Sequence, residues 1–446
     1  MDCYNDIISY MGMTKLPKGF FEAYKLYKPD NSKVLIEREY YEKLLAPYSL
    51  STEQKVFLDE TLEAIEKDQL VLEFSKFFVW DMCSMRNKYD IDNYTELIPS
   101  CLGKYNEAYA FIILLACVPV AEKELIKRGI PKEYYEDIPH RMLRDQMERY
   151  INTGKINVED LPWKMNFYTL QIFLLDRFLF IPYIHGESFT MYRSKKNGKV
   201  VAFNDPDCVY DSEGQLKRWG GIDYADEPKE EEQEGIDDTG FVYGRRKAKI
   251  NDDFITTLSI DGNILTGQYM NPCGMTENRL VSIDLNEYEK VLDKGDYLIA
   301  LHIPGGEGYT PERMHSSMKM ALEFYAKYYP ELDMKGFWSS SWLYDERLEL
   351  VIGKNRNITN VQKLMFRYSD GEDGEMLYIH LFKDMNNKLS TYECTSSLQK
   401  GAKEKLLNGE RFLTTGMMIL KEEALSGKVY YTKEDEEAFY KAIHIR

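Results

Sequence analysis

The chain contains 446 residues, which is enough for two or three domains of ordinary size. Asp and Glu number 74 against 57 Lys and Arg, so the formal net charge is −17, and no basic stripe interrupts this acidity. Because phosphate backbones repel so acidic a chain, nucleic acid is not an expected partner.

Two apolar runs are candidates for membrane segments, and neither fits one. The run 108–121 is shorter than the about 20 residues that a membrane helix needs, and it contains Pro119. The run 170–184 carries Asp176 and Arg177 in its middle. Both runs predict buried helices, and no basic segment followed by an apolar one opens the chain. We therefore expect neither a membrane partner nor a secretory signal.

Cysteine and histidine usage indicates the compartment. The seven cysteines are scattered without a Cys-x-x-Cys pair, and the six histidines show no metal-binding spacing. Scattered thiols are typical of proteins in a reducing interior. We therefore expect a cytoplasmic protein without a metal ion.

The first 180 residues carry the signals of helices. Ser51 and Gln54 form a predicted capping box at a helix start. Apolar residues then recur on one helical face, at Leu58, Leu62 and Ile65. Further helices are predicted over 107–127 and over the apolar segment 165–180. A helical N-terminal domain is expected over residues 1–165.

Strand patterns follow Pro182. Residues 189–193 and 199–203 flank Asn197-Gly198, and Asn-Gly between apolar runs is a strong hairpin signal. A second hairpin is predicted over 209–219.

An acidic stretch interrupts these strands. Residues 223–238 hold nine acidic side chains and one lysine, a composition that cannot bury itself and predicts a mobile loop. An acidic tail for a partner is the alternative interpretation. Strands are predicted to resume at 241–248 and 254–260.

From residue 296 the chain alternates strands and helices. Residues 296–304 form a continuous apolar run typical of a buried central strand, and 305–309 follow as a glycine loop. Thr310 and Pro311 then open a helix as its cap and first residue. The later predictions are a strand at 336–343, a weak helix at 346–365, a strand at 375–382, a helix at 396–408 and a strand at 412–420.

A strand that leads through glycines into a helix is a potential anion site, because unpaired amides and the helix dipole point at the ligand. The candidate amides belong to Gly305, Gly306, Gly308, Tyr309 and Thr310. A simple turn is the alternative interpretation. The loop matches neither the Gly-x-Gly-x-x-Gly nor the Gly-x-x-x-x-Gly-Lys-Ser/Thr motif, which disfavours a dinucleotide fold and a nucleoside triphosphatase.

Several segments resemble a bacterial family of acyltransferase-domain proteins, which pair a helical N-terminal domain with a GNAT-like N-acetyltransferase domain. The resemblance rests on the segments 301–307, 341–343, 128–131, 267–269 and 397–400, and it extends over most of residues 100–420. It implies an α+β fold in which helices flank a mixed, largely antiparallel sheet, with the GNAT-like domain over 166–446. Two departures stand out: the loop lacks the Gln/Arg-x-x-Gly-x-Gly/Ala form of well-studied GNAT enzymes, and Ser340 stands where relatives often carry a histidine.

The resemblance also implies how a cofactor binds. In GNAT folds the loop and the following helix hold the acyl-CoA pyrophosphate, and two parallel strands, here 297–303 and 337–343, separate to admit the pantetheine arm. Acyl-CoA, such as acetyl-CoA, is then the co-substrate, and a small-molecule or peptide amine is the acceptor. The implied cofactor-binding residues are Ile303, Gly305, Gly306, Gly308, Tyr309, Thr310 and Arg313.

Direct attack of an amine on a thioester needs a base and donors to the oxyanion and the thiolate. Glu307 and His302 are the candidate bases, and Ser341 and Tyr344 are the candidate donors to the thiolate. Each has a structural alternative: His302 as a hydrogen-bonded core residue, Glu307 as a favourable charge at the helix N-terminus, Ser341 as a partner for backbone groups. Tyr344 competes with 33 other tyrosines, since the chain holds 34.

Two rival functions remain open from the sequence. The GNAT-like fold can serve a non-catalytic protein that binds a ligand or partner. A hydrolase would need an activated nucleophile or a metal, and the sequence shows the motif of neither. The acceptor, the acyl chain length and the oligomeric state are not specified by these patterns.

Overall fold

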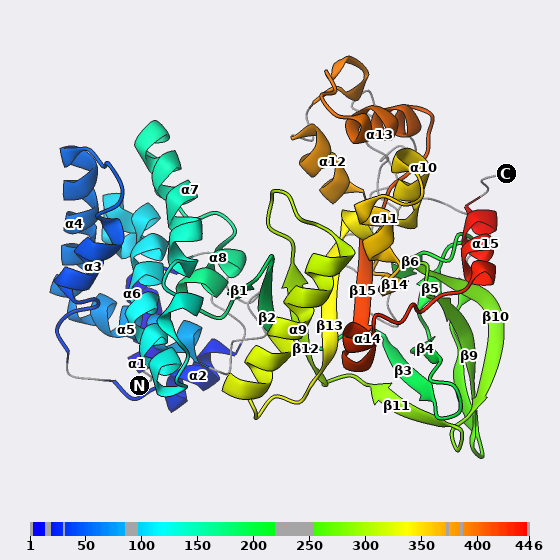
Figure 1. Ribbon diagram of the computed structural model, residues 1–446. Coiled ribbons are helices and arrows are strands. Elements are labelled where there is room, and N and C mark those ends of the chain that lie inside the picture. Colours follow the sequence, from blue (N-terminus) through cyan, green and yellow to red (C-terminus); the bar gives the residue numbers. More distant parts are fainter. Residues whose placement is uncertain are drawn as a thin grey trace. The chain divides into compact units, whose positions relative to one another are not determined.

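The computed structural model describes residues 3–13, 19–29, 32–84, 97–218, 254–371, 374–383 and 387–443 (Figure 1). The chain forms two compact units. Unit 1 comprises Met1–Leu175 and Leu179–Pro182, and unit 2 comprises Asp176–Phe178 and Tyr183–Arg446. The domain boundary expected after residue 165 stays a prediction. The predicted acidic loop at 223–238 and the predicted strand at 241–248 lie outside the described residues.

Unit 1 is helical, as the sequence predicts. Its α-helices are α1 Cys3–Met11, α2 Phe20–Leu26, α3 Arg38–Leu45, α4 Thr52–Lys67, α5 Gln69–Cys83, α6 Asn106–Lys127, α7 Ile138–Thr153 and α8 Leu161–Tyr168. The 3-10 helices η3 Ser100–Tyr105 and η4 Lys132–Tyr134 connect some of them. The capping box at Ser51 is confirmed, because its side chain accepts from the Gln54 amide while the Gln54 side chain accepts from the Ser51 amide.

The core of unit 1 lies between its longer helices. The α4 residues predicted to share one face, Leu58, Leu62 and Ile65, are all buried. Helix α6 is buried along most of its length, which explains its almost unbroken apolar sequence. Among the helices that the structure describes, none combines the length and apolarity needed to cross a lipid bilayer.

The helix predicted over 165–180 is wrong. Helix α8 ends at Tyr168, and the apolar residues that follow form two strands, β1 Phe173–Leu175 and β2 Phe178–Ile184. Asp176 and Arg177 lie in the turn between them, and Asp176 has a φ of 59°. A charged pair is costly in a core helix but readily solvated in a turn, so the charges mark the turn rather than a helix interior.

Unit 2 contains the remaining strands. They are β3 Phe189–Ser194, β4 Val200–Asn204, β5 Val209–Tyr210, β6 Leu216–Arg218, β7 Phe254–Ile255, β8 Leu258–Asp261, β9 Ile264–Asn271, β10 Met275–Asp284, β11 Tyr288–Leu292, β12 Tyr297–His302, β13 Met334–Ser341, β14 Phe366–Ser369 and β15 Thr415–Leu420. Both predicted hairpins are confirmed for the described residues, because β3 pairs with β4 and β5 pairs with β6.

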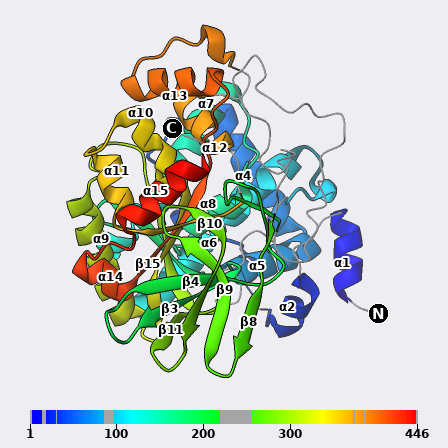
Figure 2. The same ribbon diagram turned by 90° about the vertical axis from the view of Figure 1, so that its right-hand side faces the viewer.

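The central sheet of unit 2 contains four of these strands in the order β12-β13-β15-β14. Strands β12 and β13 are parallel, whereas β15 is antiparallel to both β13 and β14. Three-stranded sheets with the orders β11-β3-β4 and β10-β9-β8 adjoin where β4 lies beside β9 (Figure 2). The expectation of an α+β fold with a mixed, largely antiparallel sheet is confirmed.

Unit 2 also contains helices. In chain order they are α9 Pro311–Tyr328, η5 Trp342–Tyr344, η6 Glu346–Leu348, α10 Glu349–Ile352, α11 Asn357–Gln362, α12 Glu375–Phe382, η7 Leu389–Thr391, α13 Ser397–Leu407, α14 Lys421–Ser426 and α15 Lys433–Ala442. Of these, α9 and α14 contact β13 of the central sheet. The weak helix predicted at 346–365 is divided among η6, α10 and α11. The strand β14 was not predicted.

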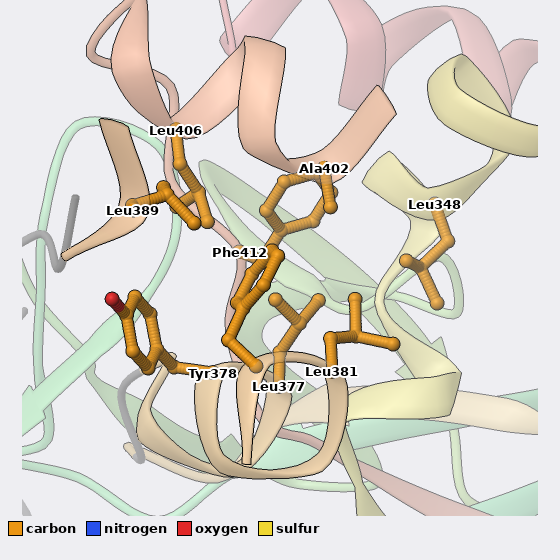
Figure 3. Packing of buried hydrophobic residues seen from close by; sticks show 9 residues of the cluster. Leu348, Leu377, Tyr378, Leu381, Leu389, Ala402, Leu406 and Phe412 are labelled. Atoms are coloured by element: carbon orange, nitrogen blue, oxygen red, sulfur yellow. The ribbon is translucent and has the colours of Figure 1, made fainter. Parts of the chain in front are cut away.

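The strand predicted at 375–382 is wrong, because these residues form helix α12. Leu377, Tyr378 and Leu381 lie on one side of this helix and point toward Ala402 and Leu406 of α13 (Figure 3). Phe412 fills the space between the two helices in the same cluster. The spacing i, i+1, i+4 is that of a helical face, and burial against α13 gives this face its partner.

Candidate functional site

The ladder between the parallel strands β12 and β13 stops before the C-terminal end of either strand. Their residues are paired as Tyr297 with Met334, Ile299 with Phe337 and Ala300 with Trp338. Beyond this last pair, no further pairing between β12 and β13 occurs in the part of the chain that the structure describes. Strand β13 nevertheless continues its ladder with β15 as far as Ser341. The ladder between the two strands therefore ends at Trp338, which is the point from which the sequence predicts a gap.

The sheet presents two different faces to this gap. Opposed residues share a face and side chains alternate along a strand, so Ala300, Trp338, His302 and Ser340 lie on one face, here called the Trp338 face. Phe337, Ser339 and Ser341 lie on the other, here called the Ser341 face. The β14 residues Tyr368 and Arg367 belong to the Trp338 face and the Ser341 face, respectively.

The two faces differ in exposure. On β13, Trp338 and Ser340 are half-buried, whereas Phe337, Ser339 and Ser341 are buried. His302 is half-buried as well. The Trp338 face is thus the partly open side of the gap.

An aromatic and acidic cluster occupies the Trp338 face. The ring of Tyr183 stacks on that of Trp338, with centroids 4.2 Å apart and planes 12° apart. The Tyr183 hydroxyl donates to Glu187 Oε1 at 3.0 Å, and Trp338 Nε1 donates to the Tyr368 hydroxyl at 2.7 Å. Phe189, from β3, lies against Tyr368 with ring centroids 4.8 Å apart.

Burial disfavours the charged form of two groups on this face, so it raises the pKa of the acid and lowers the pKa of the base. Desolvation raises the pKa of Glu187, against hydrogen bonds from Tyr183, Trp338 and Tyr368 that favour its charged form. Desolvation lowers the pKa of His302 to about 4, so its imidazole is neutral at pH 7. Across the gap from His302, Ser340 donates its hydroxyl proton to Asp370.

On the Ser341 face, the hydroxyl groups already have structural partners. Ser341 Oγ accepts from the Leu343 amide at 3.2 Å and so caps η5. Tyr344 is fully buried and donates to Ser339 Oγ at 3.0 Å, and burial raises the pKa of Tyr344. The structure therefore does not bring the four predicted catalytic residues together: His302 is on one face, and Ser341 and the Tyr344 hydroxyl are on the other.

The fourth predicted catalytic residue, Glu307, lies exposed in the glycine loop. As predicted, Thr310 caps α9, since its hydroxyl accepts from the Arg313 amide at 3.3 Å. Gly306 and Gly308 have φ values of 105° and 91°, which side chains with a Cβ rarely adopt. The Thr310 amide donates to the Gly308 carbonyl at 3.1 Å.

The other predicted phosphate-binding amides remain available. Within the described ranges, no hydrogen bond engages the amides of Gly305, Gly306, Gly308 and Tyr309. Ile303, another predicted contact of the cofactor, is half-buried directly after β12.

Arg177 holds the loop in shape, and the sequence interpretation missed it. Its Nε donates to the Glu307 carbonyl at 2.7 Å, and its Nη2 donates to the carbonyls of Pro304 at 2.8 Å and Gly306 at 3.0 Å. Three loop carbonyls therefore point toward the guanidinium group of Arg177. The signal that could have identified it is the charged pair at 176–177 inside an apolar run.

Asp176, in the turn between β1 and β2, binds residues in the first two turns of α9. Its carboxylate accepts from Ser316 Oγ at 2.8 Å and Ser317 Oγ at 3.0 Å, and it pairs with Arg313 Nη2 at 2.7 Å. Arg313, predicted to bind the cofactor, thus has a protein partner while its side chain stays 52% exposed.

Three carboxylates form an acidic group near α15. One oxygen each of Glu346, Glu349 and Glu436 lies within 4.8 Å of the others, as found among the described residues. Lys354 pairs with Glu349 at 3.2 Å and Glu436 at 2.6 Å, and Arg367 pairs with Glu346. Each of the three carboxylates is therefore paired with a cation of the chain, Lys354 or Arg367.

Comparisons with known proteins agree with this geometry. Residues 217–418 match the family model of the GNAT-like C-terminal domain. No curated protein matches the chain.

Solved structures of acyltransferases share the fold. One is an acyltransferase in complex with decanoyl-CoA and teicoplanin, with a TM-score of 0.53 and 14% identity over 94% of this chain and 99% of that one. A second, in complex with decanoyl-CoA, has a TM-score of 0.52 and 12% identity over the same shares, 94% and 99%. A third, in complex with CoA and 10C-teicoplanin, has a TM-score of 0.51 and 14% identity over 94% and 99%.

The resemblance found in the sequence is therefore confirmed. The chain pairs a helical N-terminal region with a GNAT-like C-terminal domain, the arrangement that it shares with these acyltransferase structures. A sequence identity of 12–14% establishes the shared fold, whereas the chemistry depends on the residues of the site.

Proposed function

We propose that the protein is an acyl-CoA-dependent N-acyltransferase, which moves an acyl group to an amine by direct attack and without a covalent enzyme intermediate. One observation carries the proposal: the ladder between β12 and β13 ends at Ala300 and Trp338, and the chain leaves β12 directly into a glycine loop with free amides. A gap for a thioester arm and a cradle for its pyrophosphate therefore lie at the same end of one strand.

The cradle has the properties that a pyrophosphate needs. Amide groups at a helix N-terminus, together with the helix dipole, attract anions. Three loop carbonyls accept hydrogen bonds from Arg177 and point toward it. Their negative oxygens therefore do not face the phosphate that the amides would bind. The pantetheine arm would pair with the free edge of β13 as an added strand does, beyond Trp338.

The catalytic roles divide between the two faces of the sheet. His302 is neutral at pH 7 and lies on the open face, and Glu307 is exposed in the loop, so both stay proposed bases. Ser341 and Tyr344 stay proposed hydrogen-bond donors to the departing thiolate, from the buried face.

The acyl donor and the location follow the same reasoning. Two of the similar structures hold decanoyl-CoA, so decanoyl-CoA and acetyl-CoA are the donors to compare. A reducing cytoplasm fits the six cysteines whose side chains the structure describes, because none of them forms a disulfide with another described cysteine. The acceptor is proposed to be a small-molecule or peptide amine.

Binding and turnover distinguish the proposal from its rival. The melting temperature should rise with acetyl-CoA, decanoyl-CoA or CoA, because a ligand that binds only the folded state stabilises it. Release of free CoA that depends on added primary amines, followed with a thiol reagent, identifies an enzyme. A shift without release identifies a non-catalytic binding protein. No shift with any CoA species overturns the proposal.

A further inference from the structure

The Trp338 face carries a hydrogen-bonded pair that the roles above do not use. We propose that Tyr183 and Glu187, in place of the candidate bases His302 and Glu307, accept the proton of the attacking amine, with Tyr183 meeting the amine and Glu187 receiving the proton through the Tyr183 hydroxyl. The inference rests on the proposed function and deepens it. Neither residue belongs to a motif, and both lie more than 100 residues before the glycine loop.

Position is the first argument. The Tyr183 ring stacks 4.2 Å from the ring of Trp338, and Trp338 is the last β13 residue paired with β12. The stack therefore holds the Tyr183 side chain beside the point where the gap opens. A thioester that enters the gap comes to lie next to this point.

Access is the second argument. On β13 the side chains that point to the Trp338 face are half-buried, whereas those that point to the Ser341 face are buried. Tyr344, which donates to Ser339 on that second face, is fully buried as well. An acceptor amine can thus reach the gap from the Trp338 face, where Tyr183 is half-buried.

The hydrogen bond between the two residues is the third argument. Glu187 is only 6% exposed, so its carboxylate does not meet a substrate itself. Tyr183 does, and its hydroxyl already donates to Glu187 Oε1 at 3.0 Å. A proton that arrives at the Tyr183 oxygen can therefore be passed on along an existing hydrogen bond.

The transfer forms one bond at the acyl carbon and breaks another. The amine nitrogen forms a bond to the acyl carbon, and the carbon–sulfur bond breaks with its electron pair leaving on the CoA thiolate, which takes a proton from water. The nitrogen loses one proton to the Tyr183 oxygen. The Tyr183 hydroxyl proton moves to Glu187, which later returns it to solvent. Glu187 acts through Tyr183, so Tyr183 is the catalytic residue and Glu187 its positioning and proton-accepting partner.

The surroundings of Glu187 suit this task. Tyr183, Trp338 and Tyr368 face its carboxyl group with hydrogen-bonding side chains, Lys294 acts on it at longer range, and Asp370 acts on Tyr368. Burial outweighs these contacts and raises the pKa of Glu187, which makes its carboxylate a stronger base than an exposed glutamate. The reactive form is the carboxylate, so the rate should increase as the pH rises through this pKa.

The pair is tested with two isosteric variants, Tyr183→Phe and Glu187→Gln, and with the double variant that combines them. The first keeps the ring stack on Trp338, and the second keeps an oxygen that can accept from Tyr183. The matched controls are Tyr192→Phe, in the core of the neighbouring sheet, and Glu289→Gln, exposed on β11. The probes are decanoyl-CoA with glucosamine, ethanolamine and lysine, and the readouts are CoA release, melting temperature and the pH profile of kcat.

We expect each variant to lower kcat by about 100-fold or more, and the double variant to lose no more than either alone, since the two residues act as a unit. The melting-temperature shift with decanoyl-CoA should be unchanged, and the acid limb of the kcat profile should disappear in Glu187→Gln. The control variants should keep the wild-type kcat.

Two results would overturn the inference: a kcat within about threefold of wild type in either variant, or an unaltered acid limb in Glu187→Gln, since proton transfer typically contributes 100-fold or more. If the wild-type protein neither gains stability with decanoyl-CoA nor releases CoA, the proposed function itself fails. Wild-type turnover with unaffected variants refutes the proton acceptor alone.

Discussion

The two faces of one sheet use similar side chains for different purposes. Ser339, Ser340 and Ser341 are consecutive on β13, yet Ser340 bonds to Asp370 on the half-open face while the other two satisfy groups on the buried face. Tyr183 and Tyr344 differ in the same way, the first half-buried and the second fully buried. A hydroxyl group is thus available for reaction only where the sheet leaves it reachable, and residue type alone does not distinguish the two cases.

The largest effect on stability is expected from removing a charge on the buried face. Arg367 is fully buried there and pairs with Glu346. Arg367→Met should reduce the free energy of unfolding by about 3–5 kcal/mol, because it leaves a buried carboxylate without its partner. Urea unfolding measures the loss, and adding Glu346→Gln to the variant should restore part of it. A loss below about 1 kcal/mol would contradict the assignment, since that is the range of a surface pair.

The glycine loop lies between β12 and α9 and is the proposed pyrophosphate site, so a change there tests binding apart from chemistry. Arg177→Ala removes three hydrogen bonds to loop carbonyls and should raise the Kd for decanoyl-CoA by about 10-fold or more. Titration calorimetry measures the change. Arg177→Lys should not restore affinity, because an ammonium group lacks the planar fork. Arg38→Ala, in an exposed ion pair of unit 1, is the control and should bind normally. An unchanged Kd for Arg177→Ala would refute the clamp.

Tyr344→Phe examines the hydroxyl that the buried face contributes. The variant loses the hydrogen bond to Ser339 and should cost about 1 kcal/mol of stability. If Tyr344 also donates to the thiolate, kcat should fall by about 10-fold, the worth of one such hydrogen bond, while the KM for the amine stays constant. A stability loss with an unchanged kcat would make Tyr344 a structural residue only.

A last test concerns His302, whose cost to stability depends on pH and vanishes at neutral pH. Its folded pKa of about 4 lies below its ordinary value of 6.5, so the unfolded chain binds a proton more readily between these values. This group therefore stabilises the fold above pH 6.5 and loses that contribution as the pH falls toward 4. His302→Asn should flatten the pH dependence of the melting temperature in this window. Parallel curves for the variant and the wild type would show that His302 is not desolvated.

Local patterns determined much of the fold. The capping box at Ser51, the cap at Thr310 and the hairpin at Asn197-Gly198 depend on neighbouring residues, and the structure has all three. The glycine loop and the parallel strands before and after α9 were also predictable, because buried strands and positive-φ turns have sequence signals of their own.

Two short apolar segments were predicted wrongly, one as a helix and the other as a strand. Residues 165–180 were predicted to be one helix and instead end α8 and form β1 and the start of β2, whereas 375–382 were predicted to be a strand and form α12. A short and mostly apolar segment fits either element, so its partners in the fold decide between them. For α12 that partner is α13.

The sequence by itself determined the glycine loop, its capped helix and the two strands around them, since turns and caps depend on near neighbours and a buried strand has a continuous apolar pattern. Only the tertiary structure decided which groups meet at the gap. Arg177, Tyr183 and Glu187 come from a turn, a strand and a loop far from β13 in sequence, and pairing between distant strands brings them to it. Which serine faces the open side was likewise set by strand register, which moves every side chain to the opposite face when it shifts by one residue.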